Sequence, residues 1–197
     1  MTVDQQDSIA NEKKKFGVMM VNLGTPDAPT PKAVRAYLKE FLSDVRVVDA
    51  PRIIWWFVLK IILLIRPKPV SEAYASIWTD EGSPLLAISK KQAKAVKVHL
   101  KEVTGDDIPV ELAMTYGSPS IMNAANALRA QNVERILVFP MYPQFSSSTT
   151  AAIYDKMSDL LKMCPHLPEM RWVRDYPDHP QYIAALARSV KEQWQKS

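Results

Sequence analysis

Short apolar runs alternate with amphipathic, helix-like segments along this chain, and this alternation constrains the fold more than any other feature. The clearest runs are residues 16–23 (FGVMMVNL) and Arg135–Pro140 (RILVFP). Continuous apolar runs of this length are typical of parallel strands that helices cover on both sides. The pattern therefore predicts an α/β fold with a Rossmann-like parallel sheet, helices on both faces and right-handed crossovers.

The remaining elements follow from periodicity and from signals at their ends. Thr30 and Pro31 are suited to the N-cap and first position of a helix that runs to about Leu42. Gly105 is suited to end a long helix. The other predicted strands are 109–116 and 170–173, and the other predicted helices are 84–103, 120–130, 149–163 and 180–195.

The composition argues against several classes of protein. The net charge is only +4, and the basic residues form no stripe with interleaved aromatics, so we expect no nucleic-acid partner. A single cysteine, Cys164, excludes an internal disulfide and is typical of a reducing cytoplasm. Residues 1–15 lack the apolar core of a signal peptide and are expected to be a disordered polar leader.

An apolar segment at residues 51–69 interrupts the alternation. Its centre, residues 53–65 (IIWWFVLKIILLI), carries one charge, and Arg52, Arg66 and Lys68 flank it. It is shorter than the roughly 18 apolar residues of a membrane span. The segment is either a core helix or an apolar lip that lies on a membrane or frames a hydrophobic ligand. Its tryptophans and basic flanks favour peripheral contact with the inner face of a membrane by a cytoplasmic protein.

Polar and aromatic residues follow three predicted strands at their carboxyl ends. These residues are 22–25, 115–118, and Tyr142 with the hydroxyl run 146–150. In an open parallel sheet these ends share one edge and can line one crevice. The hydroxyl run precedes a helix, so it is either an extended N-cap or a surface that binds a ligand. Each tyrosine by itself could equally be a core residue. Together they suit a large, flat, apolar ligand with anionic groups.

The histidines form no recognisable catalytic or metal-binding motif. His99 lies in a charged helix and His179 in a predicted turn, while Cys164 and His166 supply only two ligands where structural zinc needs four. No Ser-His-Asp, Cys-His or HExxH arrangement is present, and no glycine-rich phosphate loop. We therefore predict no metal ligand and no tightly bound cofactor within this chain.

Four motifs, in order and at matching spacing, resemble the ferrochelatase family, whose members insert Fe²⁺ into protoporphyrin IX to make haem. The motifs are VNLGTPDAPT from Val21, YLKEFLSD from Tyr37, IWTDEGSPLL from Ile77 and YPQFSSSTT from Tyr142. The resemblance covers residues 16–194. It implies the first of two similar Rossmann-like chelatase domains, with porphyrin bound between them and with Fe²⁺ and protoporphyrin IX as substrates.

The resemblance also indicates porphyrin-binding positions in this chain. These are Leu23, Arg66, Tyr74, Ser83, Tyr116, Tyr142, Ser146, Ser147 and Ser148. By the same resemblance, Ser83 and Arg66 would meet a propionate, Tyr74 would pack on the ring edge, and residues 53–65 would be the apolar lip. One departure is Thr115, which stands where relatives often have an arginine.

By the same resemblance, the catalytic groups lie outside this chain. Family members carry a histidine in an H-G-x-P motif and a glutamate in their second half, and none of the three histidines here fits that motif. We expect a leader at 1–15, a first chelatase domain at 16–179 that includes the lip at 51–69, and a helix at 180–197 that starts a missing C-terminal half. The 197-residue chain alone is expected to be inactive.

Two other classes of function remain open on the sequence alone. A non-catalytic tetrapyrrole-binding module would bind porphyrin without inserting a metal. An interaction module would use the apolar lip to dock a protein partner or a membrane.

Overall fold

The computed structural model describes residues 15–165 and 167–196. The predicted leader at 1–15 therefore lies almost wholly outside the described residues, as does His166 of the Cys164–His166 pair. The described part contains a four-stranded, all-parallel sheet in the order β2–β1–β3–β4, which confirms the predicted α/β class. The strands are β1 (Phe16–Thr25), β2 (Val110–Gly117), β3 (Arg135–Pro140) and β4 (Glu169–Trp172).

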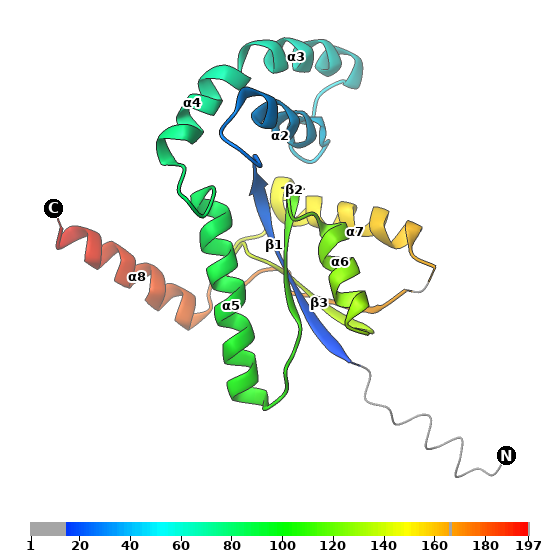
Figure 1. Ribbon diagram of the computed structural model, residues 1–197, viewed down its shortest axis with the longest axis vertical. Helices are drawn as coiled ribbons and strands as arrows, with labels where there is room; N and C mark the ends of the chain where they lie inside the picture. Colours follow the sequence, from blue (N-terminus) through cyan, green and yellow to red (C-terminus); the bar gives the residue numbers. More distant parts are fainter. Residues whose placement is uncertain (1–14, 166, 197) are drawn as a thin grey trace.

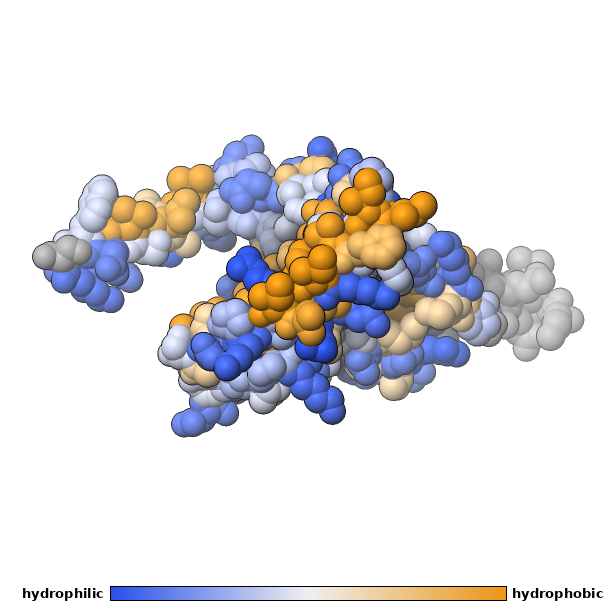
Figure 2. All heavy atoms as spheres, turned by 90° about the horizontal axis from the view of Figure 1, so that it is seen from above, coloured by the Kyte–Doolittle hydropathy of each residue, from blue (hydrophilic) through white to orange (hydrophobic). Residues whose placement is uncertain are grey.

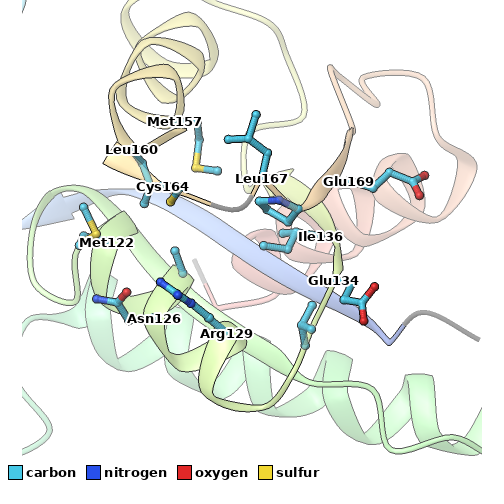
Figure 3. Close-up of a pocket in the computed structure, with 13 residues that line it drawn as sticks. Met122, Asn126, Arg129, Glu134, Ile136, Met157, Leu160, Cys164, Leu167 and Glu169 are labelled. Carbon is cyan, nitrogen blue, oxygen red and sulfur yellow. The ribbon is translucent and has the colours of Figure 1, made fainter. Parts of the chain in front are cut away.

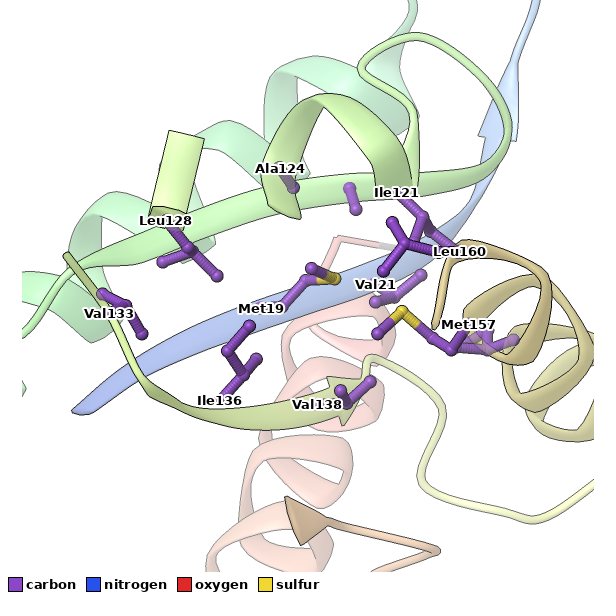
Figure 4. Close-up of a cluster of buried hydrophobic side chains, with 12 residues drawn as sticks. Met19, Val21, Ile121, Ala124, Leu128, Val133, Ile136, Val138, Met157 and Leu160 are labelled. Atoms are coloured by element: carbon purple, nitrogen blue, oxygen red, sulfur yellow. The ribbon is translucent and has the colours of Figure 1, made fainter. Parts of the chain in front are cut away.

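Helices cover the two faces of the sheet unequally (Figure 1). On one face, α6 (Ile121–Ala130) and α7 (Ala152–Met163) pack on β1, β2 and β3 and enclose the larger apolar core. Figure 4 shows Leu128 and Met157 pointing from these helices toward Met19 on β1. On the other face, among the described helices, α5 (Pro84–Thr104) packs on the sheet. The helix α8 (Pro180–Trp194) projects from the body without a buried residue.

The ends of several helices follow the predicted signals. Thr30 accepts a hydrogen bond from the Ala33 backbone N–H at 3.3 Å and so caps α2 (Pro31–Ser43). Gly105, with φ of +76°, ends α5 in the left-handed conformation that glycine adopts most readily. Ser120 and Asn123 form a reciprocal capping box at the start of α6.

Three helices form a cap above the carboxyl ends of the strands, at the top of Figure 1. They are α2, α3 (Arg52–Ile65) and α4 (Pro67–Ile77). The apolar segment predicted at residues 51–69 thus contains α3 and the start of a separate helix, α4, because Pro67 occupies a first-turn position where it needs no backbone N–H. This cap and the edge below it enclose the region that the sequence predicts to bind a ligand.

Two glycines bring β1 and β2 into close approach at this edge. Gly24 has φ of +109°, and a Cβ there would lie 1.7 Å from the Tyr116 carbonyl oxygen. Gly117 has φ of +84°, and its Cβ would lie 2.7 Å from the Thr25 carbonyl oxygen. A side chain at Gly24 would collide with backbone that cannot move aside, so the glycines are needed to hold Thr25 and Tyr116 at one edge.

Candidate functional site

The carboxyl edge of the sheet holds three buried hydroxyl oxygens that have no hydrogen-bond partner among the described residues. They are Thr25 Oγ1 at the end of β1, Tyr142 Oη just after β3, and Thr150 Oγ1 before α7. A buried hydroxyl without a partner costs about 1–3 kcal/mol, so native proteins rarely keep one without a reason. These oxygens come from three separate segments, and they lie at the edge where the strand ends predict a crevice.

Four tyrosines lie beneath the helical cap, from α2, α4, β2 and the segment after β3. They are Tyr37, Tyr74, Tyr116 and Tyr142, and burial is the main cause of a raised pKa in each. For Tyr142, nearby Tyr37 raises the pKa further, while the Thr115 hydroxyl opposes the shift without reaching hydrogen-bonding geometry. All four phenols therefore stay neutral at physiological pH and can donate hydrogen bonds, but they are poor bases.

Tyr116 supports this edge from below. Its side chain is fully buried, its hydroxyl donates to Asp44 Oδ2 at 2.8 Å, and the Phe41 ring packs edge-on against it at 5.2 Å. The sequence marks Tyr116 as a porphyrin contact, but its ring has no accessible surface in this structure. Its place indicates that it fixes the strand end, and its predicted contact with porphyrin stays a prediction.

The serine-rich run forms a π turn, η1 (Ser147–Ala151), that leads directly into α7. The regular α-helix therefore begins at Ala152, three residues later than the predicted start of 149. Ser146 makes no capping bond to a backbone N–H, and its Oγ lies 3.2 Å from Ser148 Oγ. The capping interpretation of this run is thus wrong. Ser146 and Ser147 are exposed, so their hydroxyls are free to meet a ligand, and π turns occur frequently at functional sites.

Ser83 and Leu23 lie close to the end of β1 in different environments. Ser83 is buried and accepts a hydrogen bond from the Leu86 N–H at 3.2 Å, so its hydroxyl caps α5. Asn22 donates from Nδ2 to Ser89 Oγ at 3.0 Å, which ties the first half of α5 to β1. Leu23, the next residue, is half-buried at the edge. Ser83 thus positions α5, and its predicted contact with a propionate stays a prediction.

The apolar helix α3 lies on the surface, and none of its residues is buried. Ile53 and Leu64 are 79% and 73% exposed, so the alternative of a core helix is wrong for this structure. Trp55 donates from Nε1 to the Leu42 carbonyl at 2.6 Å, which anchors α3 to the end of α2. Figure 2, seen from above, shows hydrophobic surface gathered at this end of the molecule.

Arg66 and Tyr74, both predicted as porphyrin contacts, line one shallow groove beside the lip. The groove has a volume of about 420 Å³ and is lined by Arg66, Pro69, Val70, Ala73, Tyr74 and Ile77. Arg66 is exposed and has no ion-pair partner among the described residues. Tyr74 packs edge-on against Trp78 at 6.3 Å. The groove therefore offers an unpaired cation, an aromatic ring and apolar walls.

A second cavity lies at the opposite edge of the sheet, between α6 and α7 (Figure 3). It has a volume of about 320 Å³, its wall is largely apolar, and it includes Met122, Met157 and Leu160. It reaches Glu134 and Glu169, at the amino ends of β3 and β4. Ligands of open parallel sheets bind at the carboxyl edge, so we place the candidate site there and not in this cavity.

Residues 15–165 and 167–196 contain neither a cluster of metal ligands nor a membrane-spanning helix. No three His, Cys, Asp or Glu side chains in this part of the chain gather closely enough to hold a metal ion. No helix in the same residues is long and apolar enough to cross a membrane.

Sequence reasoning missed several residues that build the edge. Tyr37 is buried beneath the cap, and Asp44 and Glu40 bind the ends of β2 through Tyr116 Oη and the Gly117 N–H. All three belong to the motif YLKEFLSD from Tyr37, but acidic residues on a helix ordinarily indicate a solvated face. Only the position of α2 against β2 shows their role.

Comparisons with known proteins agree with these features. The family model described as ferrochelatase matches residues 15–197. The chain is 56% identical over 182 residues to the ferrochelatase of Marinomonas sp. strain MWYL1, and this match covers 92% of the chain and 55% of the relative. It is 53% identical to the ferrochelatase of Pectobacterium atrosepticum, with the same coverage, and 49% identical to that of Aromatoleum aromaticum, covering 93% of the chain and 50% of the relative. The chain spans about half the length of the curated relatives it matches.

Proposed function

Because the chain belongs to the ferrochelatase family, we propose that it forms the porphyrin-holding half of an enzyme that inserts Fe²⁺ into protoporphyrin IX. The observation that carries the proposal is the carboxyl edge with its buried, unpartnered hydroxyls beneath an exposed apolar lip. Such a surface suits a flat, largely apolar macrocycle with two anionic side chains. The relatives named above bear the name of an enzyme, which favours this function over a non-catalytic tetrapyrrole carrier.

In this proposal each part of the edge has a distinct task. Tyr142, whose ring is only partly buried, and the turn at Ser146–Ser148 position the macrocycle, and the exposed serine hydroxyls donate hydrogen bonds to it. Arg66, an exposed cation in the groove beside the lip, meets a propionate, and Tyr74 packs on the ring edge. Charge-assisted hydrogen bonds from arginine to a carboxylate are stronger than neutral ones, so Arg66 would fix the orientation of the macrocycle.

Metal insertion requires loss of two pyrrole N–H protons and bending of the ring so that nitrogen lone pairs face the metal. Burial raises the pKa of Tyr37 and of Tyr142, so both phenols keep their protons at neutral pH and cannot accept the pyrrole protons. In this proposal the present chain supplies the binding surface that favours a bent porphyrin. A surface that binds the distorted ring more tightly than the flat ring lowers the barrier to metal insertion. The proton-accepting histidine and the glutamate would come from the second half that the resemblance implies.

Porphyrin titration of a full-length chimera tests the proposal. The chimera continues this chain with the second half of the Marinomonas relative. The unmodified chimera should bind protoporphyrin IX, as measured by fluorescence titration. It should also convert protoporphyrin IX to haem with Fe²⁺ under anaerobic conditions. Tyr142→Ala should weaken porphyrin binding about tenfold, while Tyr154→Ala, which removes a ring on α7 that stacks on Trp172 of β4, should leave it unchanged. An unaltered affinity in Tyr142→Ala would remove the residue from the site.

We also propose that the lip α3 contacts a membrane surface and so receives an apolar substrate. Its exposed residues include Ile53, Trp56, Phe57 and Leu64, and Lys60 Nζ lies 3.4 Å from the Trp56 ring centroid. In a flotation assay, the chain should rise with vesicles of phosphatidylglycerol and phosphatidylcholine. The double variant Trp56→Ser/Phe57→Ser should no longer rise with them. Trp194→Ser, which removes a still more exposed tryptophan on α8, is the control. Flotation that depends on Trp194 instead would contradict the proposal.

A further inference from the structure

Two ion pairs join distant segments beside the candidate site. Arg46, in the turn after α2, binds Asp155 with two hydrogen bonds, Nε to Oδ2 at 2.7 Å and Nη2 to Oδ1 at 3.0 Å. Glu40, on α2, accepts a hydrogen bond from Lys156 Nζ at 3.0 Å. The partners are 109 and 116 residues apart in the chain, so neither pair stabilises a local turn.

Asp155 and Lys156, the later partner of each pair in the sequence, lie in the first turn and a half of α7. This helix continues directly from the π turn Ser147–Ala151, which carries the exposed serines. Whatever holds Asp155 and Lys156 in place therefore also holds the serine turn. The paired arginine keeps the pKa of Asp155 below its usual value, so this carboxylate is charged at neutral pH.

The segment that carries Glu40 and Arg46, the earlier partner of each pair, is bonded to both the sheet and the lip. Glu40 accepts from the Gly117 N–H at 3.0 Å, and Asp44 accepts from the Arg46 N–H at 2.8 Å and from Tyr116 Oη at 2.8 Å. The lip α3 is anchored to the same short segment by two hydrogen bonds. Trp55 Nε1 donates to the Leu42 carbonyl, and Arg52 Nη2 donates to the Ser43 carbonyl. Residues 40–46 thus connect the strand end, the lip and α7.

We propose that the Arg46–Asp155 and Glu40–Lys156 pairs set the spacing between the lip and the serine turn, and that Arg46 is a positioning residue for the porphyrin. This inference rests on the proposed function for its effect on porphyrin, but not for its geometry. Exposed ion pairs add little to folding stability, so a role in stability alone gives a poor account of them. A bidentate pair nevertheless fixes direction as well as distance, and ligands that bridge two walls depend on both.

Distance measurement between spin labels tests the geometry in the 197-residue chain. Labels at Ile61→Cys on α3 and Ser147→Cys on the serine turn, with Cys164→Ser, should give a narrow distribution. Arg46→Asp should shift or broaden it, and Arg46→Asp/Asp155→Arg should restore it, because the swapped pair can re-form. Arg171→Asp, which breaks the exposed Arg171–Glu169 pair on β4, is the control and should have no effect. An unchanged distribution in Arg46→Asp, with folding verified by circular dichroism, overturns the inference.

Steady-state kinetics of the full-length chimera tests the consequence for porphyrin. Arg46→Gln, a milder change that introduces no repulsion, should raise KM for protoporphyrin IX three- to tenfold and change kcat by less than twofold. The charge swap should recover at least half of that loss. A fall in kcat with KM unchanged contradicts a positioning role for Arg46. Absence of turnover in the unmodified chimera contradicts the proposed function, and the label distances then still decide this inference.

Discussion

Both edges of the sheet have backbone hydrogen bonds, but the two edges differ in their buried side-chain hydroxyls. At the amino edge, backbone groups bond each other: the Arg135 N–H donates to the Lys15 carbonyl at 3.1 Å, and the Glu169 N–H donates to the Glu134 carbonyl at 2.8 Å. The carboxyl edge instead keeps three buried hydroxyl oxygens without partners among the described residues. The amino edge also carries a largely apolar cavity between α6 and α7, whereas the carboxyl edge carries the four tyrosines whose pKa is raised mainly by burial.

This difference indicates where the fold serves stability and where it serves a ligand. Natural sequences satisfy packing and hydrogen bonding at most positions and depart from both mainly at functional sites. The departures here cluster at the carboxyl edge, beneath the lip. Substitutions at the two edges should therefore change the free energy of unfolding by different amounts and in opposite directions.

The largest expected effect comes from the core behind the amino edge. Leu128 on α6 is fully buried in the larger apolar core, so Leu128→Ala should reduce the free energy of unfolding by about 2–5 kcal/mol through lost burial and a residual cavity. Urea denaturation followed by circular dichroism measures the loss. Porphyrin affinity of the folded chimera should stay the same, and an affinity that falls with stability would erase the distinction between the edges.

An effect of opposite sign is expected at the carboxyl edge. Thr150→Val removes a buried, unpartnered hydroxyl and keeps the shape, so it should raise the free energy of unfolding by about 1 kcal/mol. Thr104→Val, which removes an exposed hydroxyl that donates to the Leu100 carbonyl, should have no stabilising effect. If Thr150→Val destabilises the chain in urea, the hydroxyl is satisfied in solution and the contrast between the edges fails.

The smallest effect concerns the exposed pair between Arg46 and Asp155. Asp155→Asn should cost less than about 1 kcal/mol at neutral pH, because solvent screens this pair. The pairing lowers the pKa of Asp155, so its stabilisation is fully present above the unfolded value of about 3.9 and is lost as pH falls through the lower folded value. The difference in urea midpoint between the unmodified chain and Asp155→Asn should be the same at pH 7 and pH 5, and smaller at pH 3. A gap that closes by pH 6 would contradict this.

Much of the fold follows from local sequence signals. The strand at Arg135–Pro140 has the predicted bounds, and Thr30 and Gly105 end their helices as their residue types indicate. The four motifs indicated the family, which the family model and the relatives confirm. The π turn at Ser147–Ala151 gave no such signal, because its wide hydrogen bonds depend on how the segment meets the sheet.

The residues of the candidate site were predicted as types and as a region, but not in their individual roles. Tyr116 and Tyr142 look alike in sequence, each close to the end of a strand. In the structure Tyr116 bonds Asp44 beneath the surface, whereas the Tyr142 hydroxyl has no partner. Which tyrosine is satisfied depends on α2, a helix far from both in sequence.

The sequence by itself determined the alternation of strands and helices, the edge at which the polar residues gather, and the family. These follow from periodicity, end signals and motifs, all of which act over a few residues. Only the tertiary structure decided that α3 is exposed rather than buried, that Tyr116 supports the edge from below, and that Arg46 meets Asp155. Burial and long-range pairing depend on which surfaces meet, and that is fixed when the helices pack on the sheet.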